Sequence, residues 1–135
     1  MLWHGITLLR EFRGDGHVAA LLDGELSGLE ALITHSATGY GFTEAAAKAT
    51  RGWSDDEWAA GVEGLRRRGV LDGEGLTAGG MALRDSVERA TDRLSATPWT
   101  TLGPDRTART VELGRAFCAR IAANGAWPKG VFAAR

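Results

Sequence analysis

The side chains best suited to chemistry lie close together near the amino terminus of the chain. They are two imidazoles, two guanidinium groups and one carboxylate: His4, Arg10, Arg13, Asp15 and His17. Asp15 and His17 are two residues apart, and a carboxylate beside an imidazole can orient a proton carrier. Glycines on both sides of Asp15 permit close backbone approach, and a nearby arginine could hold an anion at a helix amino terminus. One hypothesis is therefore a small enzyme that uses Arg13, Asp15 and His17.

A purely structural role explains the same cluster more simply. The segment Arg13–Gly16 interrupts the helical pattern, which predicts one helix over residues 2–12 and another over 17–23. Asp15 would then cap the second helix and pair with Arg13, while His17 would be a partly buried residue of its first turn. Because structural ion pairs outnumber catalytic ones, we favour this explanation over the enzyme.

The remaining reactive groups indicate neither a metal ion nor a cofactor. Three histidines and a single cysteine give no recognised spacing of zinc ligands. The glycine-rich segment 13–17 does not follow a predicted strand, so it does not resemble a phosphate-binding loop. Cys118 falls on the apolar stripe of a late helix, and we expect a buried thiol there because free cysteines are usually buried.

Length and composition are those of an ordinary globular protein. The chain has 135 residues, 44% of them apolar and 24% charged, which suits a single domain over residues 1–135. No apolar run approaches the ~20 residues of a membrane span, and the amino terminus lacks the features of a signal peptide. We therefore expect a cytoplasmic protein. The formal net charge of −1 argues against general affinity for nucleic acid.

Helical periodicity predicts a mainly α fold that contains a winged helix-turn-helix. Ser54 and Glu57 form a capping box that would start the second helix of the motif. Two short strands joined by a glycine-rich turn then form a very short β-hairpin, the wing, and a long helix follows. The parts of the domain are amino-terminal helices over residues 1–37, the winged-helix core over 43–96 and a carboxy-terminal helix over 104–125.

Several segments resemble a known family of helix-turn-helix proteins. The string Leu76-Thr77-Ala78-Gly79-Gly80 resembles the stretch that opens the helix after the wing in MarR-type regulators. The chain up to Pro128 resembles more closely the carboxy-terminal half of an actinobacterial helix-turn-helix family related to those regulators. This resemblance implies a MarR-like fold, and typical members carry a further helical half in front. The segments that carry it are Leu2-Trp3-His4, LLREFRGDGHVAALL at 8–22, the helix at 29–35, ATRGWSDDEW at 49–58 and the wing.

The basic residues of the motif make duplex DNA an alternative partner. In a DNA-binding winged helix the second helix enters the major groove amino end first, where hydrogen-bond donors are needed. Here that end reads Ser54-Asp55-Asp56-Glu57, and the wing tip carries Asp72 and Glu74, so carboxylates would approach a polyanion. Helix capping explains these acids fully, but they make a DNA-binding regulator our second hypothesis. The residues that would contact DNA are Lys48, Arg51, Ser54, Arg66 and Arg67.

Five tryptophans in a short chain indicate either a cleft for a flat ligand or plain core packing. The resemblance to MarR-type proteins implies binding of small aromatic molecules between the winged helix and the dimer helices. Our leading hypothesis is therefore a non-enzymatic module that binds a small ligand or a partner protein. The candidate cleft residues are Trp3, His4, Arg13, Asp15, His17, Trp53, Trp99 and Phe117.

The distribution of charged and apolar residues predicts a homodimer. Residues 1–80 carry seven Lys or Arg against twelve Asp or Glu, whereas residues 81–135 carry nine against five. The carboxy-terminal helix also has an amphipathic stripe that includes Val111, Phe117 and Ile121. We expect the first and last helices to pair between copies, so that the acidic front of one meets the basic tail of the other.

Overall fold

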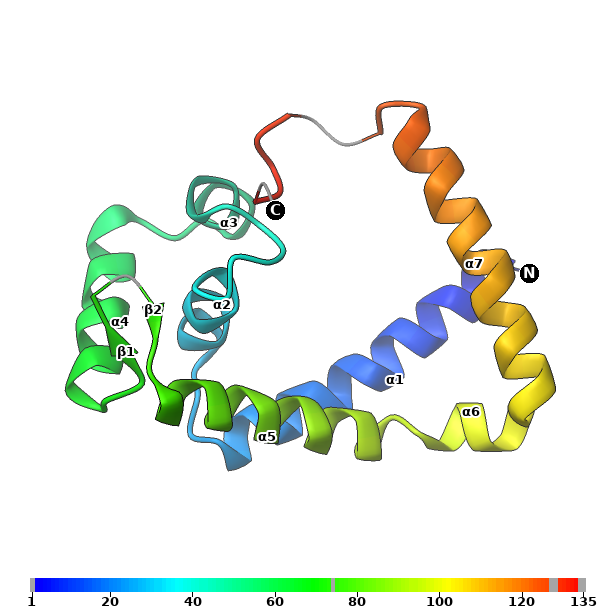
Figure 1. Ribbon diagram of the computed structural model, residues 1–135, viewed down its shortest axis with the longest axis horizontal. Coiled ribbons are helices and arrows are strands. Elements are labelled where there is room, and N and C mark those ends of the chain that lie inside the picture. Colours follow the sequence, from blue (N-terminus) through cyan, green and yellow to red (C-terminus); the bar gives the residue numbers. More distant parts are fainter. Residues whose placement is uncertain (1, 74, 127–128, 134–135) are drawn as a thin grey trace.

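The chain folds as a winged helix-turn-helix flanked by further helices. The computed structural model describes residues 2–73, 75–126 and 129–133. The elements in chain order are α1 (Leu2–Asp23), α2 (Gly28–Ser36), α3 (Glu44–Arg51), α4 (Asp55–Arg67), β1 (Leu71–Asp72), β2 (Gly75–Leu76), α5 (Ala78–Leu94), α6 (Thr97–Leu102) and α7 (Pro104–Ala123). Helices α3 and α4, the antiparallel hairpin β1–β2 and helix α5 follow the order of the winged motif (Figure 1). The mainly α fold class with a very short wing is therefore confirmed.

Helix α1 is continuous, so the predicted break at Arg13–Gly16 is wrong. Gly16 is buried against α5, where an added Cβ would lie 3.1 Å from Leu94 Cβ and 3.3 Å from Ser95 Oγ. A glycine inside a helix costs about 1 kcal/mol relative to alanine, but this one lets two helices approach closely. Figure 1 shows the carboxy-terminal part of α1 packed beside α5. Asp15 consequently lies within the helix and does not cap it.

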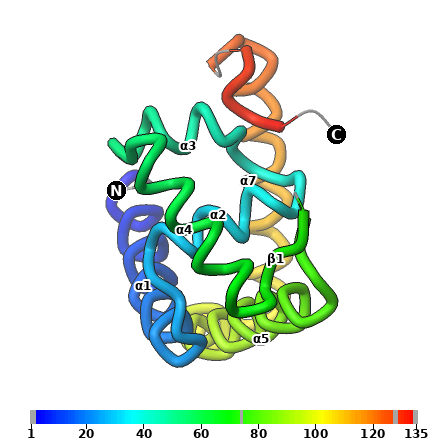
Figure 2. Tube along the Cα trace, turned by 90° about the vertical axis from the view of Figure 1, so that its left-hand side faces the viewer, coloured from blue at the N-terminus to red at the C-terminus, as the bar shows by residue number. Residues whose placement is uncertain are grey.

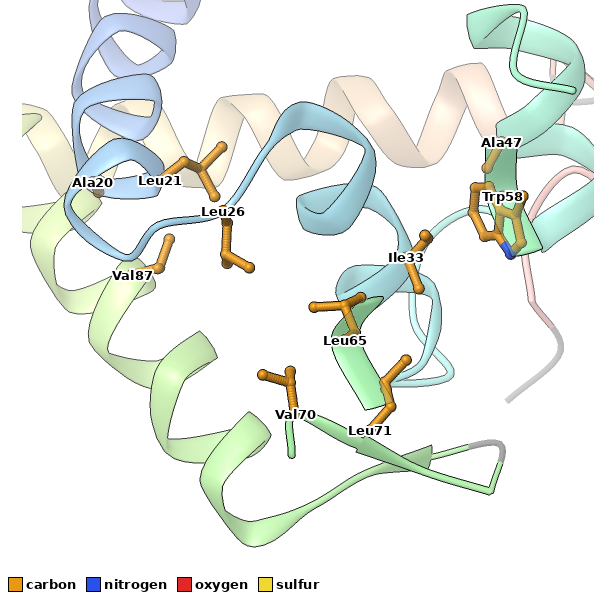
Figure 3. Close-up of a cluster of buried hydrophobic side chains, with 10 residues drawn as sticks. All are labelled: Ala20, Leu21, Leu26, Ile33, Ala47, Trp58, Leu65, Val70, Leu71 and Val87. Carbon is orange, nitrogen blue, oxygen red and sulfur yellow. The ribbon is translucent and has the colours of Figure 1, made fainter. Parts of the chain in front are cut away.

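The core lies where α1, α2, α4, the wing and α5 meet. Leu65 of α4 is 0% exposed, and it lies near Ile33 of α2 and Leu71 of β1 (Figure 3). Because burying such a side chain stabilises the fold by about 1.5–3 kcal/mol, these contacts fix the orientation of α4. The other buried apolar side chains are Ala20, Leu21, Leu26, Ala47, Trp58, Val70 and Val87.

Helices α2 and α4 begin at the residues that local sequence signals indicate. Ser27 and Glu30 form a capping box at the start of α2, and Ser54 and Glu57 form one at the start of α4. In each box the serine side chain accepts a backbone N–H, and the glutamate accepts the N–H of the serine. The starts of these two helices are therefore determined by residues within the first turn of each helix.

The wing is a hairpin that pairs Leu71 with Leu76. It is held against the start of α5 by a close approach at Gly80, where an added Cβ would lie 2.1 Å from the carbonyl oxygen of Val70. Thr77 caps α5 and donates its hydroxyl to the carbonyl oxygen of Gly69 at 2.7 Å. These contacts tie the wing to the helix that follows it.

None of the residues of helix α7 is buried. Its apolar stripe includes Phe117 at 54% exposure and Val111 at 43%. Cys118 is exposed as well, so the predicted buried thiol is wrong. Figures 1 and 2 show α7 rising from α6 as an arm on one side of the molecule. No helix within the described ranges, α7 included, is both long and apolar enough to cross a membrane.

A short carboxy-terminal segment returns to the start of α3. The backbone N–H of Thr43 donates to the carbonyl oxygen of Val131 at 3.0 Å. The rings of Phe42 and Phe132 stack with their centroids 5.3 Å apart. Residues 129–133 thus contact the segment that leads into α3 (Figure 1).

Candidate nucleic-acid interface and ligand cleft

Helix α4 turns one face to the core and the opposite face to solvent. Trp58 and Leu65 anchor the inner face at 5% and 0% exposure. Gly52 ends α3 in the left-handed conformation, with φ of 74°, and this lets the chain turn sharply into α4. Small side chains on the outer face would allow close approach to a groove. The exposed residues of α4 include Asp56, Ala59, Ala60, Glu63 and Arg67.

The carboxylates at the amino end of α4 are engaged in local contacts. Glu57 accepts the backbone N–H of Ser54 at 2.9 Å, and this hydrogen bond lowers the pKa of Glu57. Lys48 Nζ donates to Asp55 Oδ1 at 2.6 Å and to Glu44 Oε1 at 2.8 Å. The Lys48 contact lowers the pKa of Asp55, and hydrogen bonds to both acids raise the pKa of Lys48. Capping and ion pairing therefore account for Asp55 and Glu57, and Lys48 already has acidic partners.

The other basic residues predicted to contact DNA differ in how available they are. Arg66 Nη2 donates to the carbonyl oxygen of Gly73 at 2.6 Å, so it fixes the wing to α4. Arg67 has a long contact of 3.8 Å with Glu63. Arg51, at the end of α3, is exposed and forms no ion pair with the described residues. Of the residues predicted to contact DNA, Arg51 and Arg67 therefore have the guanidinium groups most free to contact phosphate.

The winged motif as a whole is slightly acidic. Residues 43–96 carry eight Lys or Arg against ten Asp or Glu. Asp56 and Asp72 are exposed, and Glu74 at the wing tip lies outside the described residues. A phosphate backbone would be repelled by these side chains unless Arg51 and Arg67 face it.

A cleft of about 710 Å³ lies between α1, α2, α5 and the turn that precedes α4. The side chain of Arg84, on α5, is 11% exposed, and its Nη2 atom lies 3.0 Å from Glu88 Oε1. Glu88 Oε2 also pairs with Arg13 at 3.2 Å. Other side chains that line the cleft include His17, Leu32, His35, Phe42, Arg51 and Trp53.

Both histidines of the cleft have lowered pKa values. His17 Nδ1 lies 2.9 Å from Thr91 Oγ1, and the Thr91 hydroxyl donates to the carbonyl oxygen of Val87, so the imidazole Nδ1–H is the donor. Burial is the main reason that the pKa of His17 is lowered. Burial and the guanidinium of Arg84 likewise lower the pKa of His35. At neutral pH both imidazoles are therefore uncharged.

The structure brings together only part of the predicted ligand cleft. Arg13, His17 and Trp53 line the cleft described above. Trp99 lines a second hollow of about 860 Å³ between α5, α6 and α7, to which Arg13 also contributes. The other predicted residues are exposed and lie outside both hollows; they are Trp3, His4, Asp15 and Phe117.

The hypothetical catalytic cluster of Arg13, Asp15 and His17 is not assembled. Asp15 is exposed and forms no ion pair or hydrogen bond with either of the others, because residues two apart on a continuous helix do not face each other. The predicted pair of Asp15 with Arg13 is therefore wrong, and Arg13 pairs instead with Glu88. Within the described ranges, no group of three or more His, Cys, Asp or Glu side chains could hold a metal ion.

Sequence reasoning missed Arg84, Glu88 and His35 as residues of the cleft. A signal for Arg84 exists in the spacing of α5, because it occupies the inward-facing stripe of the helix. A charged residue at such a position is normally paired or functional, since burying an unpaired charge is costly. The buried residues of α5 are Gly80, Arg84, Val87 and Thr91.

Comparison with known proteins identifies one family. A family model described as a helix-turn-helix family matches residues 1–128, which include α1 to α7. Searches of curated proteins and of solved structures found no match. The family match therefore covers both the winged motif and the cleft beneath it.

Proposed function

The chain belongs to this helix-turn-helix family, and we propose that it binds duplex DNA as a regulator related to the MarR type. The observation that carries the proposal is the exposed outer face of α4, set between α3 and the wing in a chain whose family match spans the motif. In winged helices the corresponding helix lies in the major groove, while basic side chains around it contact phosphates. This function was our alternative to a ligand-binding module, and the family match favours it.

The contacts around α4 support a specific mode of binding. Lys48 neutralises Asp55, so less negative charge meets the DNA than the sequence of α4 indicates. Ala59 and Ala60 permit the helix to approach the groove, and Arg51 and Arg67 are placed to bind phosphates on either side. Asp56 opposes this approach, and its charge would keep affinity moderate.

A binding experiment with matched variants tests the proposal. The anisotropy of a labelled duplex of mixed sequence, at low salt, should rise with protein concentration and fall as salt is added. Arg51→Ala and Arg67→Ala should each weaken binding by about 3- to 10-fold, and Asp56→Asn should strengthen it. Arg93→Ala, at an exposed position in the last turn of α5, is the control and should leave binding unchanged. Binding that ignores salt, or that falls equally in the control, would contradict the proposal.

We further infer that the DNA-binding form is a homodimer joined through α1 and α7. Exposed apolar side chains lie on both helices, among them Leu8 at 71% exposure on α1 and Leu113 at 54% on α7. The acidic front and the basic tail of the sequence would attract each other between copies. Two copies would present two α4 helices, which suits binding to two half-sites.

Small-molecule binding in the cleft is the second candidate function. One observation favours it: Arg13, His17 and Trp53 line a cleft that also contains the buried guanidinium of Arg84. The volume of about 710 Å³ is in the range of ligand sites in proteins. Thermal stabilisation by a small compound, lost when Trp53 is changed to Ala, would support this function. Screening that finds no such compound would count against it.

A further inference from the structure

The cleft between α1, α2 and α5 contains a guanidinium group whose positive charge is only partly balanced by a carboxylate. Arg84 as a whole residue is 9% exposed. A buried charge is costly unless it is paired and hydrogen-bonded. Its acidic partner is Glu88, at 3.0 Å, and the same carboxylate also binds Arg13 at 3.2 Å. One carboxylate therefore serves two guanidinium groups. The remaining contact of Arg84 Nη2 is a weak one, to His35 Nδ1 at 3.4 Å.

The rest of the lining increases this imbalance of charge. The described residues that line the cleft include three guanidinium groups, those of Arg13, Arg51 and Arg84, and one carboxylate, that of Glu88. The two imidazoles add hydrogen-bonding groups without adding negative charge. The cleft thus has an excess of positive charge in a partly buried setting, where an anion interacts more strongly than it does in bulk water.

The cleft also has apolar walls and a fixed rim. Leu32, Phe42 and Trp53 supply apolar surface beside the charged groups. Gly41 has φ of 79°, and an added Cβ there would lie 2.3 Å from His35 Nε2, so the loop packs directly on this imidazole. A site held in this way is ordered before a ligand arrives, which favours binding because less freedom is lost.

We propose that this cleft binds a small organic anion, with its carboxylate or phosphate oxygens on Arg84 and Arg51 and its apolar body against Phe42 and Trp53. The proposal rests on the second candidate function above, because it names the chemical class of that ligand. A charge-assisted hydrogen bond to a guanidinium group is stronger than a neutral one, so the anionic head distinguishes the ligand from a neutral compound of equal size.

Matched probes test the chemistry of the ligand. The probes are cyclohexanecarboxylate, cyclohexyl phosphate and the neutral cyclohexanecarboxamide, with inorganic phosphate as a head group without a body. Calorimetric titration should show at least one of the two organic anions binding about 10-fold or more tightly than the amide. The stronger of the two identifies carboxylate or phosphate as the head. Inorganic phosphate should bind more weakly than that organic anion, since it leaves the apolar walls uncovered.

Variants of the cleft test its location. Arg84→Gln should abolish binding of the preferred anion, and because Arg84 is buried, Arg51→Gln at the exposed rim provides a second test that spares the core. Arg51→Gln should weaken binding of the anion by about 3- to 10-fold and leave binding of the amide unchanged. Arg10→Gln, on the same helix as Arg13 but outside the cleft, is the control and should bind like the wild type.

Three results would overturn the proposal in distinguishable ways. Equal binding of the amide and the anions would refute an anion site while preserving small-molecule binding in the cleft. Absence of binding by every probe would count against the second candidate function as well. Anion binding that is unchanged in both Arg51→Gln and Arg84→Gln would place the anion elsewhere on the molecule.

Discussion

The winged motif and the arm formed by α7 both contain amphipathic helices, but only the motif buries its apolar side chains. In the motif, inward-facing residues such as Leu65 and Ala47 are 0% exposed, and the helix starts have side-chain caps. In the arm, the apolar stripe is equally regular, yet Phe117 remains 54% exposed and α7 begins without a side-chain cap. The apolar face of the motif is buried within the described chain, whereas the apolar stripe of α7 stays exposed.

From this difference we expect the winged motif to determine the free energy of unfolding and α7 to determine self-association. Contacts that hold α4 in place are internal, so their loss should lower the free energy of unfolding. Contacts of α7 are available to another copy, so their loss should change assembly while leaving the motif folded. The predictions below test this division, beginning with the largest expected effect.

The strongest test of the division compares a core leucine with an arm phenylalanine. Leu65→Ala should lower the free energy of unfolding by about 2–5 kcal/mol, because it removes a fully buried side chain and leaves a cavity. Phe117→Ala, under dilute conditions that favour the monomer, should change it by less than about 0.5 kcal/mol. Urea denaturation followed by circular dichroism measures both values. Equal losses would refute the division.

Two adjacent glycines give a matched test of the packing between the wing and α5. Gly80→Ala should destabilise the fold by about 1–3 kcal/mol, since the new Cβ would lie 2.1 Å from the carbonyl oxygen of Val70. Gly79→Ala should be neutral or slightly stabilising, because its Cβ would have no neighbour closer than 3.6 Å. Thermal unfolding of the two variants should separate them clearly. A stable Gly80→Ala protein would contradict the close approach.

The arm should control self-association. Phe117→Ser should weaken the proposed dimer by about 10-fold or more, because it replaces an exposed aromatic side chain of the apolar stripe with a polar one. Arg106→Ala, in the first part of the same helix, is a control for general effects of substitution on α7. Sedimentation velocity across micromolar concentrations measures the equilibrium. A wild-type protein that stays monomeric over this range would refute the dimer.

The smallest expected effect is a pH dependence that originates in the cleft. The pKa values of His17 and His35 are lowered in the folded chain, chiefly by burial, so the unfolded chain binds protons more readily. Stability should therefore fall as the pH decreases from about 7.5 to about 5.5, a range above that in which carboxylates titrate. His17→Gln should reduce this fall. A loss of stability at rising pH over the same range would contradict the burial of the imidazoles.

The sequence predicted the features that depend on local signals. The capping box at Ser54, the short hairpin and the helix that begins at Pro104 all follow from residues within a few positions of each other. The break predicted near Gly16 was wrong because this glycine allows α5 to pack closely against a continuous α1. A local sequence pattern cannot distinguish such a glycine from one that ends a helix.

The candidate site was less predictable, because its residues come together only in three dimensions. Periodicity identified the stripe that contains Cys118, but it carries no information on whether another surface covers that stripe. The resemblance to MarR-type proteins and the number of tryptophans placed Trp99 and Phe117 in one cleft with His17, although they lie on different helices and outside that cleft. Arg84 was accessible to the same reasoning, since it occupies an inward position of α5.

The measurement that tests DNA binding most directly is an NMR titration of the ¹⁵N-labelled chain with a duplex of mixed sequence at low salt. The account predicts that amide signals of α4, the end of α3 around Arg51 and the wing will shift, and that added salt will reverse the shifts. Shifts confined to α7, or an unchanged spectrum at saturating duplex, would show that the exposed face of α4 does not bind DNA.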